Sequence, residues 1–203
     1  MRRFVTSLLL ILGLFSVCSC SKTPQIAKLP SGGVVLAFGD SITFGTGATP
    51  AESYPSILEK RIGRRVVNAG VPGEVTAEGK VRFASVLDEF NPALVLLCLG
   101  GNDFLRHQDE SHAAENLRAM ITLAHNRGIG VVLIAVPKLG FGLEVPKFYR
   151  EIAKDLAIPL EEKTLKHILS KSSLKSDSVH PNAEGYSILA DSLTKLLHDS
   201  GAL

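Results

Sequence analysis

Tryptophan is absent from this chain of 203 residues, and cysteine occurs only three times. Cys18 and Cys20 lie at the end of an apolar N-terminal run, so Cys98 is the one cysteine in the body of the chain and has no partner there for a disulfide. The sequence also has no Cys-x-x-Cys pair and no paired histidines, which are the common patterns of zinc sites. We therefore expect a domain without a disulfide and without a metal ion.

A strong charge of either sign is also missing. The chain carries 22 Lys and Arg against 20 Asp and Glu, and removal of residues 1–19 takes away only Arg2 and Arg3, leaving 20 of each sign. A balanced chain of this kind offers no basic surface for nucleic acid. Gly100-Gly101 lacks the lysine and the spacing of a phosphate-binding loop or a dinucleotide fingerprint. We expect neither a nucleic-acid partner nor a bound cofactor.

The longest apolar run lies at the N-terminus, where residues 8–17 follow Arg2 and Arg3. A basic stretch before an apolar run that is too short to span a bilayer is typical of an export signal. We expect residues 1–19 to be this signal, which is removed from the mature protein.

The run ends in Ser19 and Cys20, a small residue before a cysteine, as in the lipobox of bacterial lipoproteins. We expect Cys20 to be the lipid attachment site and residues 20–33 to tether the domain to a membrane of the cell envelope. Plain secretion into the periplasm is the alternative, because Cys18 is not a preferred lipobox residue. Residues 34–203 are long enough for one domain with a full core.

Within that domain, apolar runs alternate with helical patterns. Four runs are unbroken, as in parallel strands covered on both faces. These runs are 34–38, 65–68, 94–99 and 131–136. The helical patterns include one between Ser53 and Gly63, one over 115–127, and a last helix capped by Asn182. The alternation predicts a three-layer α/β/α domain.

Four unusual loop segments stand out beside these elements. They are Gly39-Asp40-Ser41 after the first run, Asn68 to Gly73 after the second, Gly100 to Asp103 after the third, and Asp177 to His180 before the last helix. A serine in a tight turn that follows a buried strand is a candidate nucleophile. Gly-Asp-Ser alone is more often a solvated turn, so the hypothesis depends on the presence of all four segments in one order.

Together, the four segments resemble the marker blocks of the SGNH, or GDSL, hydrolase family, with the closest likeness to its periplasmic acyl-thioesterase, lysophospholipase and arylesterase branch. The marker residues are Ser41, Gly73, Asn102 and His180. The resemblance implies a flavodoxin-like parallel sheet with strand order 2-1-3-4-5. In that order the loops after the first three strands meet at one carboxyl edge of the sheet, where the topology switches direction.

The residue types suit acyl transfer. A serine hydroxyl is protonated near neutral pH, so Ser41 needs a base, and His180 is the candidate, because an imidazole can take up the proton and later return it. Asp177, three residues earlier, can fold back to orient the ring. The resemblance further implies an oxyanion hole made by the backbone N–H groups of Ser41 and Gly73 and the side-chain amide of Asn102.

We therefore predict a serine esterase that hydrolyses carboxylic ester or thioester bonds of short to medium acyl chains, lysophospholipids included, as a monomer. Asp40 and Asp103 are expected to brace their loops, and the other five histidines to lie on the surface. Two alternatives remain: a carbohydrate O-acetyl esterase, against which the lack of tryptophan weighs, and an envelope lipid-binding lipoprotein without turnover. A wall of the acyl pocket, or else a loop folded over the core, is expected from Leu139, Phe141, Leu143, Val145 and Phe148.

Overall fold

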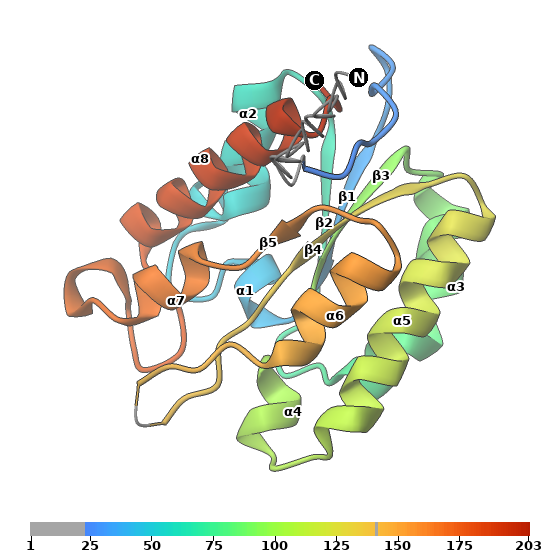
Figure 1. Cartoon of the computed structure of the whole chain (residues 1–203). Helices are drawn as coiled ribbons and strands as arrows, with labels where there is room; N and C mark the ends of the chain where they lie inside the picture. Colours follow the sequence, from blue (N-terminus) through green and yellow to red (C-terminus); the bar gives the residue numbers. More distant parts are fainter. Residues whose placement is uncertain (1–22, 141) are drawn as a thin grey trace, which may run out of the picture.

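The computed structural model describes residues 23–140 and 142–203 (Figure 1). The expected export signal, Cys20 and Phe141 lie outside these ranges. At the centre is a five-stranded parallel sheet in the order β2-β1-β3-β4-β5. The strands are β1 Val35–Gly39, β2 Val66–Gly70, β3 Leu94–Cys98, β4 Gly130–Ile134 and β5 Leu160–Glu161. The predicted fold and strand order are therefore confirmed.

Helices cover both faces of the sheet (Figure 1). One face packs against α2 Tyr54–Ile62, α7 Thr164–Leu169 and α8 Ala183–Asp199, and the other against α3 Thr76–Phe90, α5 Glu110–Asn126 and α6 Lys147–Asp155. Successive residues of β1 point to opposite faces of the sheet. Val35 packs in the core beneath α2, α7 and α8, and Leu36 packs in the core beneath α3, α5 and α6. The remaining elements are short: α1 Ser41–Phe44, η1 Pro50–Glu52, α4 Gly101–Leu105 and η2 Ser172–Leu174.

Residues ahead of β1 belong to the packed domain. The Ile26 N–H donates to the Ser200 carbonyl at 2.9 Å, and the Leu29 N–H donates to the Ala202 carbonyl at 2.8 Å. The Leu29 side chain is buried in the core. The described part of the expected tether therefore runs along the C-terminal residues (Figure 1), and packing begins several residues before the expected boundary at position 34.

The sheet order brings three loops together. β1 lies between β2 and β3, and its last residue, Gly39, is in register with Gly70 and Cys98. The loops that follow these strands therefore leave from adjacent positions at the carboxyl edge, on either side of the switch point.

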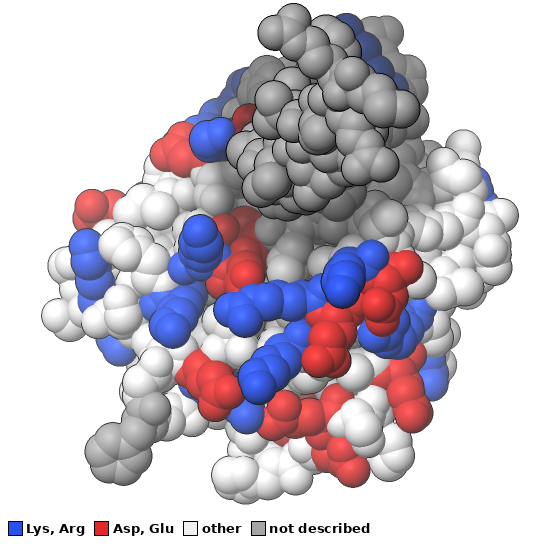
Figure 2. All heavy atoms as spheres, in the orientation of Figure 1, with Lys and Arg blue, Asp and Glu red and all other residues white. Residues whose placement is uncertain are grey.

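The molecular surface mixes charges of both signs. Figure 2 shows Lys and Arg interspersed with Asp and Glu on the face seen in Figure 1. Among the residues that the structure describes, no helix is both long and apolar enough to cross a membrane.

Candidate active site

Ser41 is presented by a tight turn at the end of β1. The Asp40 side chain accepts the Ile42 N–H at 3.0 Å and so caps α1, which begins at Ser41. A Cβ on Gly39 would lie 2.2 Å from the Cys98 carbonyl oxygen, so only glycine allows this approach to β3. The sequence Gly-Asp-Ser thus folds into a turn that directs the serine into a crevice.

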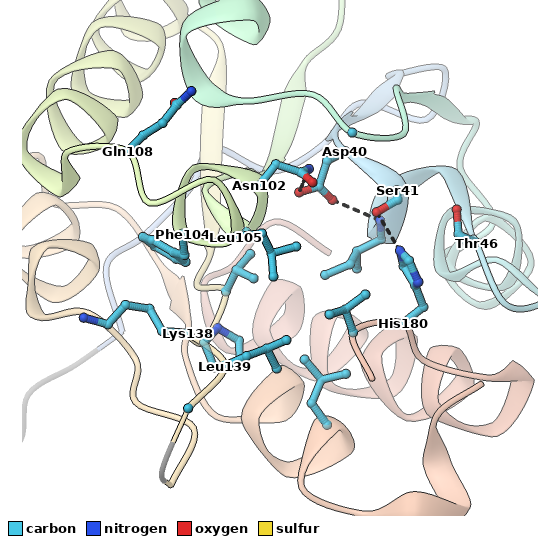
Figure 3. Close-up of a pocket in the computed structure, with 18 of the residues that line it drawn as sticks. Asp40, Ser41, Thr46, Asn102, Phe104, Leu105, Gln108, Lys138, Leu139 and His180 are labelled. Atoms are coloured by element: carbon cyan, nitrogen blue, oxygen red, sulfur yellow. Dashed lines mark hydrogen bonds between the residues drawn. The ribbon is translucent and has the colours of Figure 1, made fainter. Parts of the chain in front are cut away.

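A chain of hydrogen bonds links Ser41 to His180 and Asp177. His180 Nε2 lies 2.9 Å from Ser41 Oγ (Figure 3). On the other side of the ring, His180 Nδ1 lies 2.7 Å from Asp177 Oδ2. The other carboxylate oxygen accepts the N–H groups of Val179 at 2.8 Å and His180 at 2.9 Å, so the loop folds back as its spacing predicts. Partial burial would raise the pKa of Asp177, but the hydrogen bonds from His180 and Val179 hold it below its ordinary value.

Gly73 and Asn102 lie in the same crevice as Ser41 and His180. Gly73 has a φ of 83°, a left-handed conformation that favours glycine. The Asn102 amide nitrogen donates to the Glu74 carbonyl at 3.0 Å and lies 3.4 Å from Asp40 Oδ2. This bond fixes the amide beside the Ser41 turn, where Figure 3 shows it next to Asp40.

Two acidic residues brace these loops, as expected. Asp103 is buried and accepts the Thr76 hydroxyl at 2.6 Å and the Thr76 N–H at 3.0 Å, which ties α4 to the start of α3. Asp40 is also buried. Burial raises the pKa of Asp40 to about 7; the Ile42 N–H opposes this rise, and the charges of Glu74 and Asp103 add to it.

The crevice has a volume of about 920 Å³ and a largely apolar wall. The wall consists of Ile42, Phe104, Leu105, Val136, Leu139, Leu169 and Val179. Of the described residues expected there, Leu139 lines the crevice, whereas Val145 and Phe148 pack in the core and Leu143 lines a separate hollow. Val145 and Phe148 thus follow the second alternative, a segment folded over the core, because the chain after Glu144 turns inward to begin α6.

Most residues of the apolar wall could not be predicted from the sequence. Leu105 and Leu169 belong to α4 and α7, which are too short to show a helical pattern in the sequence. His107 was expected only on the surface, but although it is exposed it also lines the crevice.

Within the described ranges, no three His, Cys, Asp or Glu side chains are grouped so that they could hold a metal ion. Cys98 is a buried free thiol in β3. The crevice brings a serine and a histidine, with the carboxylate bonded to that histidine, to the switch point of a parallel sheet. Such an arrangement is typical of serine hydrolases, in which the imidazole takes the serine proton and the carboxylate orients the ring.

Comparison with known proteins gives the family. The model of the GDSL-like lipase/acylhydrolase family matches residues 37–188. An arylesterase from Vibrio mimicus is 29% identical over 168 residues, which cover 77% of this chain and 84% of that protein. Thioesterase 1/protease 1/lysophospholipase L1 from Escherichia coli K12 is 27% identical over 180 residues, covering 82% and 86%. A crystal structure of TesA matches with a TM-score of 0.73 at 28% identity, covering 81% of this chain and 97% of that one.

The chain belongs to the GDSL-like lipase/acylhydrolase family, and it is an ester-bond hydrolase. The predicted resemblance to SGNH hydrolases is confirmed.

The pKa of Asp40 predicts a pH effect on stability. Its native value of about 7 lies above its ordinary value of 3.8, so between these values the native state keeps a proton that the unfolded state has lost. Wild-type stability therefore carries a contribution that falls by roughly 1.4 kcal/mol per pH unit over this range and levels off above it. Asp40→Asn keeps the acceptor for Ile42, cannot ionise and lacks this contribution.

In urea denaturation, we expect the stability of Asp40→Asn relative to wild type to increase from pH 5 to pH 7 and then to level off. Asp88→Asn, an exposed carboxylate on α3, serves as the control and should show no such trend. A pH-independent difference for Asp40→Asn would mean that the carboxyl group is ionised throughout.

Proposed function

We propose that the protein is a serine esterase that hydrolyses carboxylic ester or thioester bonds of short to medium acyl chains through an acyl-enzyme on Ser41. The observation that carries this proposal is the pair of hydrogen bonds that join His180 to Ser41 and to Asp177, at 2.9 and 2.7 Å, beside an apolar crevice. An activated nucleophile and an acyl-binding wall then lie at one site.

In the proposed reaction, Ser41 Oγ attacks the acyl carbonyl carbon while its proton passes to His180 Nε2. His180 next gives that proton to the departing alkoxide or thiolate, and the acyl group stays on Ser41. A water molecule, deprotonated by His180, then attacks the acyl carbon. The bond from that carbon to Ser41 Oγ breaks, His180 returns the proton to Oγ, and the carboxylic acid leaves. Asp177 keeps the ring oriented and stabilises the imidazolium in both steps.

The negative oxygen formed on attack needs hydrogen-bond donors. We propose the backbone N–H groups of Ser41 and Gly73 and the side-chain amide of Asn102. One amide hydrogen of Asn102 bonds to the Glu74 carbonyl, which orients the second toward the side of the crevice where Asp40 and Ser41 lie. A single donor of this kind typically contributes ~10²-fold to ~10³-fold to turnover.

The wall of the crevice supports acyl esters as substrates. The seven apolar side chains of the wall line the crevice together with Pro72 and Pro137, which favours an acyl chain over the polar groups of a carbohydrate. The names arylesterase and thioesterase 1/protease 1/lysophospholipase L1 of the two relatives support a carboxylic ester or thioester, with lysophospholipids in the same class.

For the cellular location, we propose export, removal of residues 1–19 and lipid attachment at Cys20 in the bacterial envelope, with plain release into the periplasm as the alternative. Support comes from Arg2 and Arg3 before an apolar run, and from the small residue before Cys20. We propose that the enzyme acts as a monomer, since Ser41, His180 and Asp177 meet within one chain.

Replacement of the nucleophile tests the proposed reaction. Ser41→Ala in residues 21–203 should lower kcat for p-nitrophenyl butyrate by ~10⁶-fold, because the acyl-enzyme cannot form. Ser85→Ala, an exposed serine on α3, should match wild type. Retention of a tenth of the activity by Ser41→Ala would rule out this nucleophile, and an inactive, folded wild type would favour the lipid-binding alternative.

The polar end of the crevice should set the acyl chain length. Lys138 Nζ pairs with Glu110 Oε1 at 2.7 Å, both residues line the crevice, and Figure 3 shows Lys138 across the pocket from Ser41. A longer chain would have to meet this ion pair. Lys138→Met should therefore raise kcat/KM for dodecanoyl esters about 10-fold, because burial of about two more methylenes contributes roughly 0.8 kcal/mol each. The kcat/KM for acetyl esters should not change.

The comparison requires p-nitrophenyl esters from two to sixteen carbons. Lys195→Met, which removes a surface ion pair with Asp199 on α8, is the matched control and should leave the chain-length profile as in wild type. An equal change for acetyl and dodecanoyl esters in Lys138→Met would show that the ion pair does not limit chain length.

A further inference from the structure

An ion pair lies behind the loop that carries Gly73. Glu74 follows that glycine, and its side chain is only 4% exposed. Arg82, on the second turn of α3, binds both Glu74 carboxylate oxygens, Oε1 through Nε at 2.5 Å and Oε2 through Nη2 at 2.7 Å. Two parallel bonds of this kind fix the direction of both side chains.

Arg82 also reaches the ends of two strands. Its Nη2 donates to the Ala69 carbonyl near the end of β2 at 2.9 Å and lies 3.4 Å from the Gly39 carbonyl at the end of β1. The guanidinium carbon lies 3.9 Å from the centroid of the Phe38 ring. One side chain thus contacts the strands from which the Ser41 and Gly73 loops leave.

Glu74 extends these contacts to the third loop. Its backbone carbonyl is the acceptor that holds the Asn102 amide nitrogen at 3.0 Å. The side chain of Glu74 is therefore tied through Arg82 to β1 and β2, while its backbone is tied to α4. A shift of Glu74 would move the neighbouring Gly73 peptide and the Asn102 amide together.

We propose that Arg82 and Glu74 are positioning residues for the oxyanion hole, and that they hold the Gly73 N–H and the Asn102 amide where the substrate oxygen becomes negative. This inference rests on the proposed function. Neither side chain lines the crevice, so both act through the loops. A buried ion pair is weak evidence for a gain in stability, whereas a misplacement of about 1 Å at a reacting group can cost ~10²-fold in rate.

The test is a double-mutant cycle between Arg82→Lys and Asn102→Ala, with kcat and KM for p-nitrophenyl butyrate expressed per active site titrated by a fluorophosphonate. Lysine keeps the charge but cannot form the two parallel bonds. We expect Arg82→Lys to lower kcat 10-fold to 100-fold and to change KM less than 3-fold. In the Asn102→Ala background, Arg82→Lys should lower kcat only about 3-fold, because a donor that Arg82 positions is already missing.

Arg127→Lys is the matched control. Arg127, at the end of α5, forms a surface ion pair with Asp88, which lies on α3 as Arg82 does. It should leave kcat unchanged in both backgrounds. Glu74→Gln removes the charge that pairs with Arg82 but keeps the backbone carbonyl that accepts the Asn102 amide. It provides a second double-mutant cycle if Arg82→Lys does not fold. It is expected to lower kcat with the same loss of additivity.

Two kinds of result would overturn the inference. If Arg82→Lys and Glu74→Gln leave kcat unchanged, or if their costs add fully to that of Asn102→Ala, the ion pair does not act through the oxyanion donors, although the proposed function stands. If wild type is inactive or Ser41→Ala remains active, the proposed function fails and this inference fails with it.

Discussion

The packing of β1 between β2 and β3 is the constraint on which the site depends. A Cβ on Gly39 would lie 2.2 Å from the Cys98 carbonyl oxygen, and one on Gly70 would lie 2.1 Å from the Phe44 nitrogen. These two glycines let the strands and the first turn of α1 approach closely. Because β1 lies between the other two strands, the loops that carry Ser41, Gly73 and Asn102 start side by side. The loop before α8 then brings His180 to Ser41.

Buried acids join these loops, and each is compensated in a different way. Asp103 receives hydrogen bonds from Thr76, Glu74 is paired with Arg82, and Asp40 has a raised pKa. Each of these contacts lowers the cost of a carboxyl group in a place with little water, and under the proposed function it also limits repulsion of the oxyanion. The loops that carry Ser41, Gly73 and Asn102 are thus held by polar contacts, whereas the sheet behind them is held by apolar packing.

Much of the site could be predicted from the sequence because its residues lie in short contiguous motifs. Ser41 follows an unbroken apolar strand, and Asp177 and His180 are three residues apart, so their contact is local. The family resemblance implies a fifth strand, but its position could not be predicted from the sequence, since the two residues of β5 are too few to form a pattern. Arg82 was missed because its contacts depend on the fold, and in the sequence it is one polar residue of a helix.

The boundary of the domain shows the same limit. Residues before β1 have the composition of a linker, but Leu29 is buried and its N–H pairs with the Ala202 carbonyl. Only the fold brings the two ends of the domain together. Contacts between residues far apart in sequence decide whether an apolar side chain lines the crevice or packs in the core. Leu139 lines the crevice, whereas Phe148 packs in the core.

The proposed reaction requires that Ser41 is an activated nucleophile. This requirement can be tested by treating residues 21–203 with a fluorophosphonate and locating the adduct by peptide mass mapping. We expect one adduct per chain, on Ser41, formed much more slowly in His180→Ala. An adduct on another serine, or the same rate of labelling without His180, would contradict it.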